Sequence, residues 1–237
     1  MEIVVRDGRI ELPASSMSMK RSTTELIARG SGNISYSRPF WYRASMSEIL
    51  LYPTETLYAL GVNALDSNAL EVLLTLKGRD HTKTPSWLVR TLDDVHEYAE
   101  VSDVAARIAH KFLPGPLTLV LPALPHVTSD VIASDRTIGF RVSSDPIAIR
   151  MVAEFGEQQG APLTCTSANV SGAPTLQTPA EILQQFGEKA SAITHVIDDG
   201  TRKALATTVV RVVGSDVTVL REGEIPERAL REVVKDV

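Results

Sequence analysis

The chain has 237 residues and a net charge of −5, so it can hold one domain with a sizeable core and generates no long-range field that attracts nucleic acid. Apolar residues make up 43% and charged residues 22%, as in ordinary globular proteins, and no apolar run is long enough to span a bilayer. The acidic, polar start of the chain lacks the pattern of a secretory signal.

Cysteine and histidine usage limits the covalent and metal chemistry. Cys165 is the only cysteine, so no internal disulfide can form, and we expect a reducing, cytoplasmic compartment. We interpret Cys165 as a small buried apolar side chain, with a nucleophile as the alternative. The five histidines show no metal-ligand spacing and no thiolate cluster supports them, so we expect no structural zinc and no metal ligands.

The first 46 residues differ in composition from the rest of the chain. Residues 3–6 and 9–12 flank Asp7-Gly8, which is a strong signal for a two-residue hairpin. A stretch rich in Ser, Met and Thr follows and is typical of a loop or linker. We therefore predict an N-terminal extension over residues 1–46 and the main domain over residues 47–237.

From residue 48 onward, strand and helix signals alternate. The predicted strands cover residues 49–52, 117–121, 138–142, 163–166, 196–198, 207–213 and 217–221. The predicted helices begin at Asp66 or Ser67, at Ser102, at Asp145-Pro146, at Thr178 and at Pro226, and Gly78 and Gly187 end the first and fourth of them. This alternation predicts an α/β fold with helices on the faces of the sheet, and the short turn at 214–216 makes its last two strands antiparallel.

A basic pair, Lys77 and Arg79, lies at the predicted end of the first helix. The chain has no glycine-rich phosphate loop of the G-x-x-x-x-G-K type, so phosphate binding would have to use side chains and helix ends. Cations at a helix C-terminus are also stabilising by about 0.3–1 kcal/mol each, which is the structural alternative. The residue types alone leave both interpretations open.

Polar clusters follow two of the predicted strands. Tyr-Pro-Thr-Glu-Thr at 52–56 and Thr-Ser-Ala-Asn at 166–169 both come directly after apolar runs. Ligands of open α/β sheets bind outside the carboxyl ends of strands, whereas turns whose hydroxyls bond their own backbone are the alternative. Arg141 lies in an otherwise apolar strand and requires an anionic partner, either a carboxylate of the chain or one of a ligand.

In this order, the clusters resemble the YrdC-type threonylcarbamoyl-adenylate synthases, and the similarity runs from about residue 49 to residue 224. It rests on the segments at 52–56, at 77–79 (Lys-Gly-Arg), at 114–118 (Pro-Gly-Pro-Leu-Thr), at 141 (Arg), at 166–172 (Thr-Ser-Ala-Asn-Val-Ser-Gly) and at 220–223 (Leu-Arg-Glu-Gly). The resemblance implies a twisted mixed sheet, parallel and antiparallel, which is flanked by helices and has a concave ligand groove.

The resemblance also implies a reaction. The amine of L-threonine takes up bicarbonate to form a carbamate, which attacks the α-phosphate of ATP and releases pyrophosphate, with Mg2+ accompanying the ATP. The product, threonylcarbamoyl-AMP, passes to partner proteins that modify an adenosine of tRNA, and a contact with tRNA or double-stranded RNA is part of the same expectation. Because like charges about 4 Å apart repel by about 4 kcal/mol at an effective dielectric near 20, cations are needed to bring carbamate and triphosphate together.

Site residues follow from the resemblance, position by position. The implied ATP-binding residues are Lys77, Arg79, Lys83, Ser143, Ser167, Asn169, Thr175 and Arg221, and Lys77 and Arg79 are also the implied catalytic pair. The implied threonine-binding residues are Thr54, Thr56, Thr118 and Arg141, with Arg141 as the candidate for the carboxylate.

Three alternatives remain. Ala59, Asp80 and Ser143 depart from the synthase pattern and lean toward YciO-like paralogues, which would bind a nucleotide or RNA without synthase activity. Those paralogues typically lose the K-x-R and S-x-N residues that this chain keeps, which favours the synthase. A noncatalytic RNA-binding module and a carbamoyl-transfer domain are the other two, and the net charge of −5 disfavours the first of these.

Overall fold

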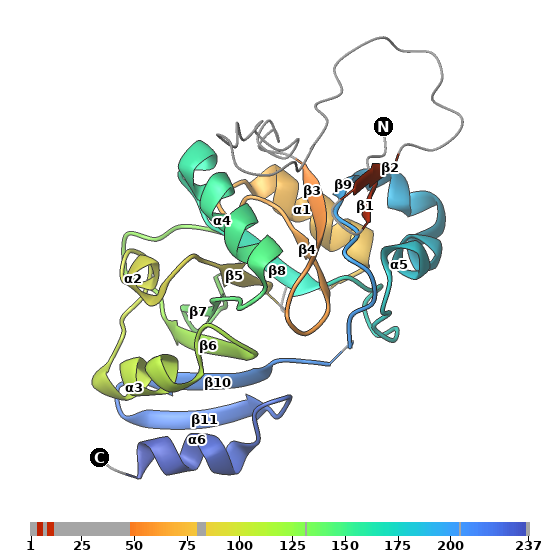
Figure 1. Cartoon of the computed structure of the whole chain (residues 1–237). Coiled ribbons are helices and arrows are strands. Elements are labelled where there is room, and N and C mark those ends of the chain that lie inside the picture. Colours follow the sequence, from red (N-terminus) through yellow and green to blue (C-terminus); the bar gives the residue numbers. More distant parts are fainter. Residues whose placement is uncertain are drawn as a thin grey trace, which may run out of the picture.

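A computed structural model describes residues 4–6, 9–11, 48–79, 84–130, 132–203 and 205–235. Its centre is a nine-stranded sheet in the order β11-β10-β6-β7-β5-β8-β4-β3-β9, with helices packed against it (Figure 1). The pairs β10–β6, β5–β7 and β3–β9 are parallel, and the other neighbours in this sheet are antiparallel. The predicted fold class, a mixed sheet flanked by helices, is confirmed.

The strands of this sheet are β3 (Ile49–Pro53), β4 (Tyr58–Gly61), β5 (Ser86–Leu88), β6 (Leu117–Pro122), β7 (Thr137–Arg141), β8 (Leu163–Ser167), β9 (Ile193–Val196), β10 (Thr208–Val213) and β11 (Asp216–Arg221). The helices are α1 (Ser67–Lys77), α2 (Leu92–Val95), α3 (Asp103–Phe112), α4 (Pro146–Gln159), α5 (Pro179–Phe186) and α6 (Glu227–Val234), and a 3-10 helix covers Gly187–Ala192. None of the described helices is long and apolar enough to cross a membrane.

Helix boundaries follow the local signals of the sequence. Asp66, Ser102 and Asp145 each accept hydrogen bonds from backbone amides of the first turn of α1, α3 and α4. Thr178 forms a capping box with Glu181 at the start of α5. These side chains satisfy amides that have no partner within the helix, so the predicted helix starts are confirmed.

Strand predictions were less complete. β9 covers Ile193–Val196 and begins three residues before the strand predicted at 196–198, because its pairing with β3 sets its position. Short β4, β5 and α2 were not predicted, since three or four residues carry too little periodicity.

Near the start of the chain, β1 (Val4–Arg6) and β2 (Arg9–Glu11) form the predicted antiparallel pair. Residues 12–47 lie outside the described residues. The division into an extension over 1–46 and a domain over 47–237 therefore stays a prediction.

Two cores lie on opposite faces of the sheet, because successive residues of a strand point to opposite sides. The larger core joins buried residues of α1, α3, α5 and α6 to one face. The smaller core joins α4 to residues of β3, β4, β5 and β8 on the other face, and Figure 1 shows α4 lying over this part of the sheet. In the described part of the chain, this smaller core contains no residue of β6, β7, β10 or β11. On the α4 side, these four strands are therefore the part of the sheet on which polar groups can gather.

Gly78 determines how the chain leaves α1 toward Arg79. Its φ of 58° is left-handed, and its amide bonds to the carbonyl groups of Leu74 and Thr75. Since a side chain in this conformation costs about 1–2 kcal/mol, we expect Gly78→Ala to lower the free energy of unfolding by that amount. Urea unfolding measures the change.

A matched control is Gly156→Ala inside α4, because an added Cβ meets no atom within 4 Å at either glycine, and Gly156 does not have a positive φ. This variant should gain about 0.5–1 kcal/mol. Equal effects at the two positions would show that backbone conformation is not the cause.

Candidate functional site

A row of cross-strand neighbours carries three of the predicted site residues. The strand register makes Leu88 and Arg141 neighbours, and it makes Thr118, Val209 and Arg221 neighbours beside a register shift between Val209 and Val210. Thr118 precedes Leu119 and Arg141 follows Phe140, and these two are cross-strand partners, so the two groups are adjacent on the sheet. Cross-strand neighbours project to the same face, and Leu88 belongs to the core under α4. Arg141, Thr118 and Arg221 therefore share the α4 face of the sheet, on strands that this helix leaves uncovered.

Arg141 has a carboxylate of the chain as its partner. Its Nη2 donates to Oε1 of Glu55 at 2.5 Å and to Oγ1 of Thr56 at 3.4 Å, and its Nη1 donates to Sγ of Cys165 at 3.2 Å. The second carboxylate oxygen of Glu55 accepts a hydrogen bond from Ser143. Burial opposes the charge on Arg141, but the fields of Cys165 and Glu55 outweigh it and raise the pKa of this guanidinium. A structural carboxylate thus satisfies the buried charge.

The two threonines predicted to bind L-threonine form a turn between β3 and β4. Thr54 Oγ1 donates to the carbonyl of Leu57 at 2.6 Å and accepts from the amides of Thr56 and Leu57. Both threonine side chains are fully buried. The observed hydrogen bonds match the structural alternative for this motif, and they fix the position of Glu55 between the two threonines.

Lys77 connects the end of α1 to the end of β8. Its side chain is 2% exposed, and its Nζ donates to the backbone carbonyls of Ser167 and, at 2.7 Å, of Asn169. In the opposite direction, the carbonyl of Lys77 accepts from the amide of Ser171 at 2.8 Å. The K-x-R and S-x-N segments are therefore joined by direct contacts across about ninety residues of sequence.

The S-x-N loop is held by its own side chains as well. Ser167 Oγ donates to Oδ1 of Asn169 at 2.5 Å, and Nδ2 of Asn169 donates to the carbonyls of Val170 and Ala173. These bonds set the orientation of both predicted nucleotide-binding side chains. Whether they bind a nucleotide stays a prediction.

Arg79, just after α1, reaches Thr166, which precedes the last residue of β8. Its Nη1 donates to Oγ1 of Thr166 at 2.7 Å and its Nη2 to the carbonyl of Thr84 at 3.3 Å. Its buried Nε has no hydrogen-bond partner among the described residues. None of these partners carries a charge, so the observed contacts leave the positive charge of Arg79 uncompensated.

Arg221, at the end of β11, binds Thr207. Its guanidinium donates to the carbonyl and to Oγ1 of Thr207, and this hydroxyl is 3.0 Å from Oγ1 of Thr118. The hydroxyl of Thr207 therefore orients both Thr118 and Arg221.

Four cationic side chains lie within electrostatic range of one another, each influencing the next. Burial and then the charge of the next member lower the pKa values of Lys77, Arg79 and Arg221, with Arg79 acting on Lys77, Arg221 on Arg79, and Arg141 on Arg221. In the part of the chain that is described, Glu55 is the only carboxylate in an ion pair with any of the four. A protein with a net charge of −5 thus concentrates unmatched positive charge at one place.

The structure brings most of the predicted residues together, with two exceptions. Lys83 falls within residues 80–83, which lie outside the described residues, and Thr175 lies in the loop before α5 with a half-buried side chain. Sequence reasoning did not assign Glu55, Thr166 or Thr207 to the site. Glu55 and Thr166 lie beside predicted residues in the motifs at 52–56 and 166–172, which is a signal that could have found them, whereas Thr207 lies in none of the motifs.

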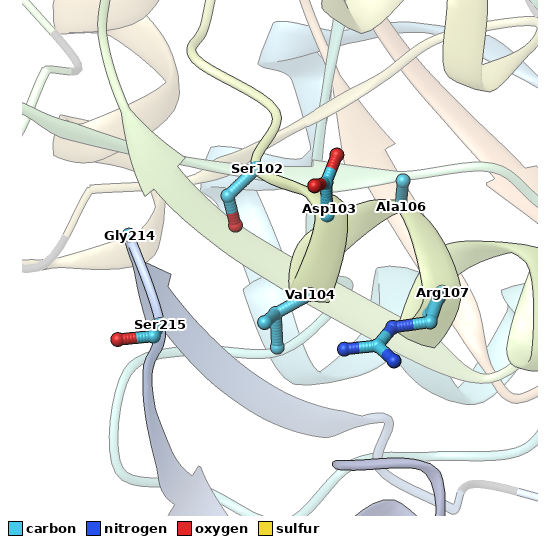
Figure 2. A pocket seen from close by; sticks show the side chains of 7 residues that line it. All are labelled: Ser102, Asp103, Val104, Ala106, Arg107, Gly214 and Ser215. Carbon is cyan, nitrogen blue, oxygen red and sulfur yellow. The ribbon is translucent and has the colours of Figure 1, made fainter. Parts of the chain in front are cut away.

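A hollow of about 690 Å³ lies elsewhere, between α3 and the turn that joins β10 to β11 (Figure 2). Its lining residues are Ser102, Asp103, Val104, Ala106, Arg107, Gly214 and Ser215. None of them belongs to the cationic cluster. The concave ligand groove stays a prediction for the α4 side of β6, β7, β10 and β11.

The fold and the cluster define an α/β protein with a site suited to an anionic ligand. The family of Sua5, YciO and YrdC, described as "Telomere recombination", matches residues 45–223. This chain belongs to that family. The resemblance inferred from the sequence motifs is thereby confirmed.

Two relatives show how far the similarity extends. A protein of Methanocaldococcus jannaschii is 36% identical over 184 residues, which are 77% of this chain and 83% of that protein. The threonylcarbamoyl-AMP synthase of Photobacterium profundum is 32% identical over 74% of this chain and 92% of its own length.

Two solved structures share the fold. The structure of Pyrococcus abyssi Sua5 complexed with L-threonine has a TM-score of 0.71 and 29% identity, and it covers 81% of this chain. This chain spans 55% of the Pyrococcus protein. The structure of E. coli YciO has a TM-score of 0.68 and 28% identity, and the match covers 78% of this chain and 87% of YciO.

The buried amine of Lys77 makes a pH-dependent prediction. Burial and the charge of Arg79 lower its pKa from 10.5 to about 7 in the folded state. Between these two pH values the unfolded chain binds the proton and the folded chain does not, so stability rises with pH and is lowest below pH 7. Relative to Lys77→Met, the wild type should gain up to about 1.4 kcal/mol of unfolding free energy per pH unit above pH 7.

Urea unfolding of both proteins at pH 6, 7, 8 and 9 measures this difference, and subtraction removes all titrations that the two proteins share. A constant difference between the two proteins across this range would contradict the lowered pKa.

Proposed function

We propose that this protein is an L-threonylcarbamoyladenylate synthase, which forms threonylcarbamoyl-AMP and pyrophosphate from L-threonine, bicarbonate and ATP. The observation that carries the proposal is the series of four cationic side chains with a single carboxylate partner. Relatives named threonylcarbamoyl-AMP synthase and the threonine complex of Sua5 support the choice of substrates.

The chemistry explains why such a cluster is needed. A carbamate carries a negative charge and must approach the α-phosphate of a polyanionic triphosphate. Fixed cations oppose the repulsion between the two reactants and stabilise the charge that develops on the phosphate oxygens in the transition state. Because hydrogen bonds to Thr166, Cys165 and Thr207 hold the guanidinium groups of Arg79, Arg141 and Arg221 in place, little reorganisation of these groups is required during the reaction.

The binding residues divide between ATP and L-threonine in this proposal. Lys77 and Arg79 act on the phosphates as the catalytic pair, Lys77 also through the S-x-N loop that it holds. The remaining ATP-binding residues are Lys83, Ser143, Ser167, Asn169, Thr175 and Arg221. L-Threonine binds near Arg141 and Thr118, within the framework that Thr54 and Thr56 form.

Magnesium enters with ATP in this proposal. Glu55, the carboxylate of the cluster, is held by Arg141 and Ser143, so the phosphates themselves would be the main ligands of the ion. The product would pass to tRNA-modification partner proteins, and the proposal includes a contact with tRNA and a cytoplasmic location.

The YciO-like alternative rests on the similarity to E. coli YciO. It predicts nucleotide or RNA binding without pyrophosphate release. The retained K-x-R and S-x-N residues favour the synthase. Lys77 donates hydrogen bonds to the carbonyls of Ser167 and Asn169, and Arg79 donates one to the hydroxyl of Thr166.

Purified protein should release pyrophosphate only when L-threonine, bicarbonate and ATP are all present. Arg79→Ala should lower kcat/KM by about 100- to 1,000-fold, as expected when one fixed donor to a developing charge is lost. A coupled pyrophosphate assay measures both quantities.

The matched control is Arg90→Ala, because the Arg90 side chain is 50% exposed and pairs only with neighbouring Asp94 in the contacts observed. Its activity should equal that of the wild type. Release without threonine, or an Arg79→Ala variant with nearly full activity, would refute the proposed function.

A further inference from the structure

We propose that Glu55 recognises the α-ammonium group of the amino-acid substrate, and that its ion pair with Arg141 opens to receive the substrate zwitterion. The inference rests on the proposed function and adds a specificity residue to it. Glu55 would exchange its internal cation for the cation of the substrate, while Arg141 would exchange Glu55 for the substrate carboxylate.

Geometry places the carboxylate on the accessible side of the pair. The Arg141 side chain is 5% exposed, whereas that of Glu55 is 12% exposed. The 2.5 Å contact joins one terminal nitrogen of the guanidinium to one carboxylate oxygen, and the other oxygen of Glu55 accepts from Ser143. A ligand therefore reaches Glu55 before it reaches the deeper part of Arg141.

Charge gives the reason for the exchange. L-Threonine enters as a zwitterion, and its ammonium group would be repelled by the guanidinium groups of Arg79, Arg141 and Arg221. Glu55 is the only carboxylate that pairs with any of these cations in the described part of the chain, so it is the available acceptor for an ammonium group. Replacing one internal ion pair by two pairs with the substrate keeps every charge matched.

Rigid surroundings allow the exchange without loss of the framework. Arg141 keeps its contacts with Thr56 and Cys165 when Glu55 moves away. The backbone on both sides of Glu55 is fixed by the hydroxyl of Thr54, so only the Glu55 side chain has to turn. Because the carboxylate and ammonium groups of an α-amino acid are attached to one carbon, they suit two partners that lie in direct contact.

The same arrangement predicts selectivity against acids that lack an amine. A hydroxy acid offers Arg141 a carboxylate but leaves Glu55 without a cation once the internal pair has opened. The wild type should therefore bind L-threonine more tightly than 2,3-dihydroxybutyrate, in which a hydroxyl replaces the amine.

Glu55→Gln tests this inference, since it removes the charge but keeps the shape and an oxygen acceptor. Isothermal titration should show that the variant binds L-threonine about 10- to 100-fold more weakly, as for the loss of a charge-assisted hydrogen bond. Its affinity for 2,3-dihydroxybutyrate should be unchanged or higher, and its affinity for ATP should stay that of the wild type. Glu55→Asp should keep the preference for threonine, and Glu154→Gln, in an exposed pair with Arg150, should change neither affinity.

Equal weakening of both acids in Glu55→Gln would mean that Glu55 only positions Arg141, and would overturn the inference. Unchanged threonine binding would overturn it as well. Circular dichroism confirms folding, and if Glu55→Gln does not fold, a loss of the threonine preference in Glu55→Asp overturns the inference. Failure of the proposed function is distinguishable, because then the wild type itself neither binds threonine nor releases pyrophosphate with it.

Discussion

The hydrogen bonds of one buried amine connect the parts of the site. Lys77, at the last position of α1, donates to the carbonyl of Ser167 at the end of β8 and to that of Asn169 in the loop after it, and the carbonyl of Lys77 accepts from the amide of Ser171. A lysine is rarely this buried, and the cost of removing it from water is offset only by such fixed acceptors. The position of the S-x-N loop therefore depends on where α1 ends, and α1 ends at Gly78 because this residue adopts a left-handed conformation.

From this point, the charges of the site follow in sequence across the sheet. Arg79 follows the end of α1 and lies within range of the charge of Arg221, and Arg221 is a neighbour of Val209, which also pairs with Thr118. Like charges are brought together although each lowers the pKa or opposes the ionisation of its neighbour. Such an arrangement lowers stability unless an anion binds, which is the usual sign that a cluster serves recognition rather than folding.

Local signals in the sequence predict much of the fold. Asp66, Ser102 and Asp145 have side chains that cap helices, so their effect is confined to four or five residues and is legible without a structure. β5 could not be predicted in this way, because its three residues form a strand only through β7 on one side and β8 on the other.

The site shows the same limit. The motifs named most residues of the cluster, but Glu55 acquires its role through Arg141, which is 86 residues away in sequence. Sequence reasoning left the partner of Arg141 open between a carboxylate of the chain and one of a ligand. Only the folded geometry identifies Glu55, since no local pattern links the two positions.

The unequal cover of the sheet by α4 has an evolutionary consequence. On one face of the sheet, β3, β4, β5 and β8 are occupied by the smaller core, whereas β6, β7, β10 and β11 contribute nothing to it in the described part of the chain. On this face, the packing residues of the smaller core and the polar residues Arg141, Thr118 and Arg221 thus lie on different strands. Substitutions on the uncovered strands can alter which ligand binds while the covered strands keep the fold, so one scaffold can diversify its chemistry without rebuilding its core.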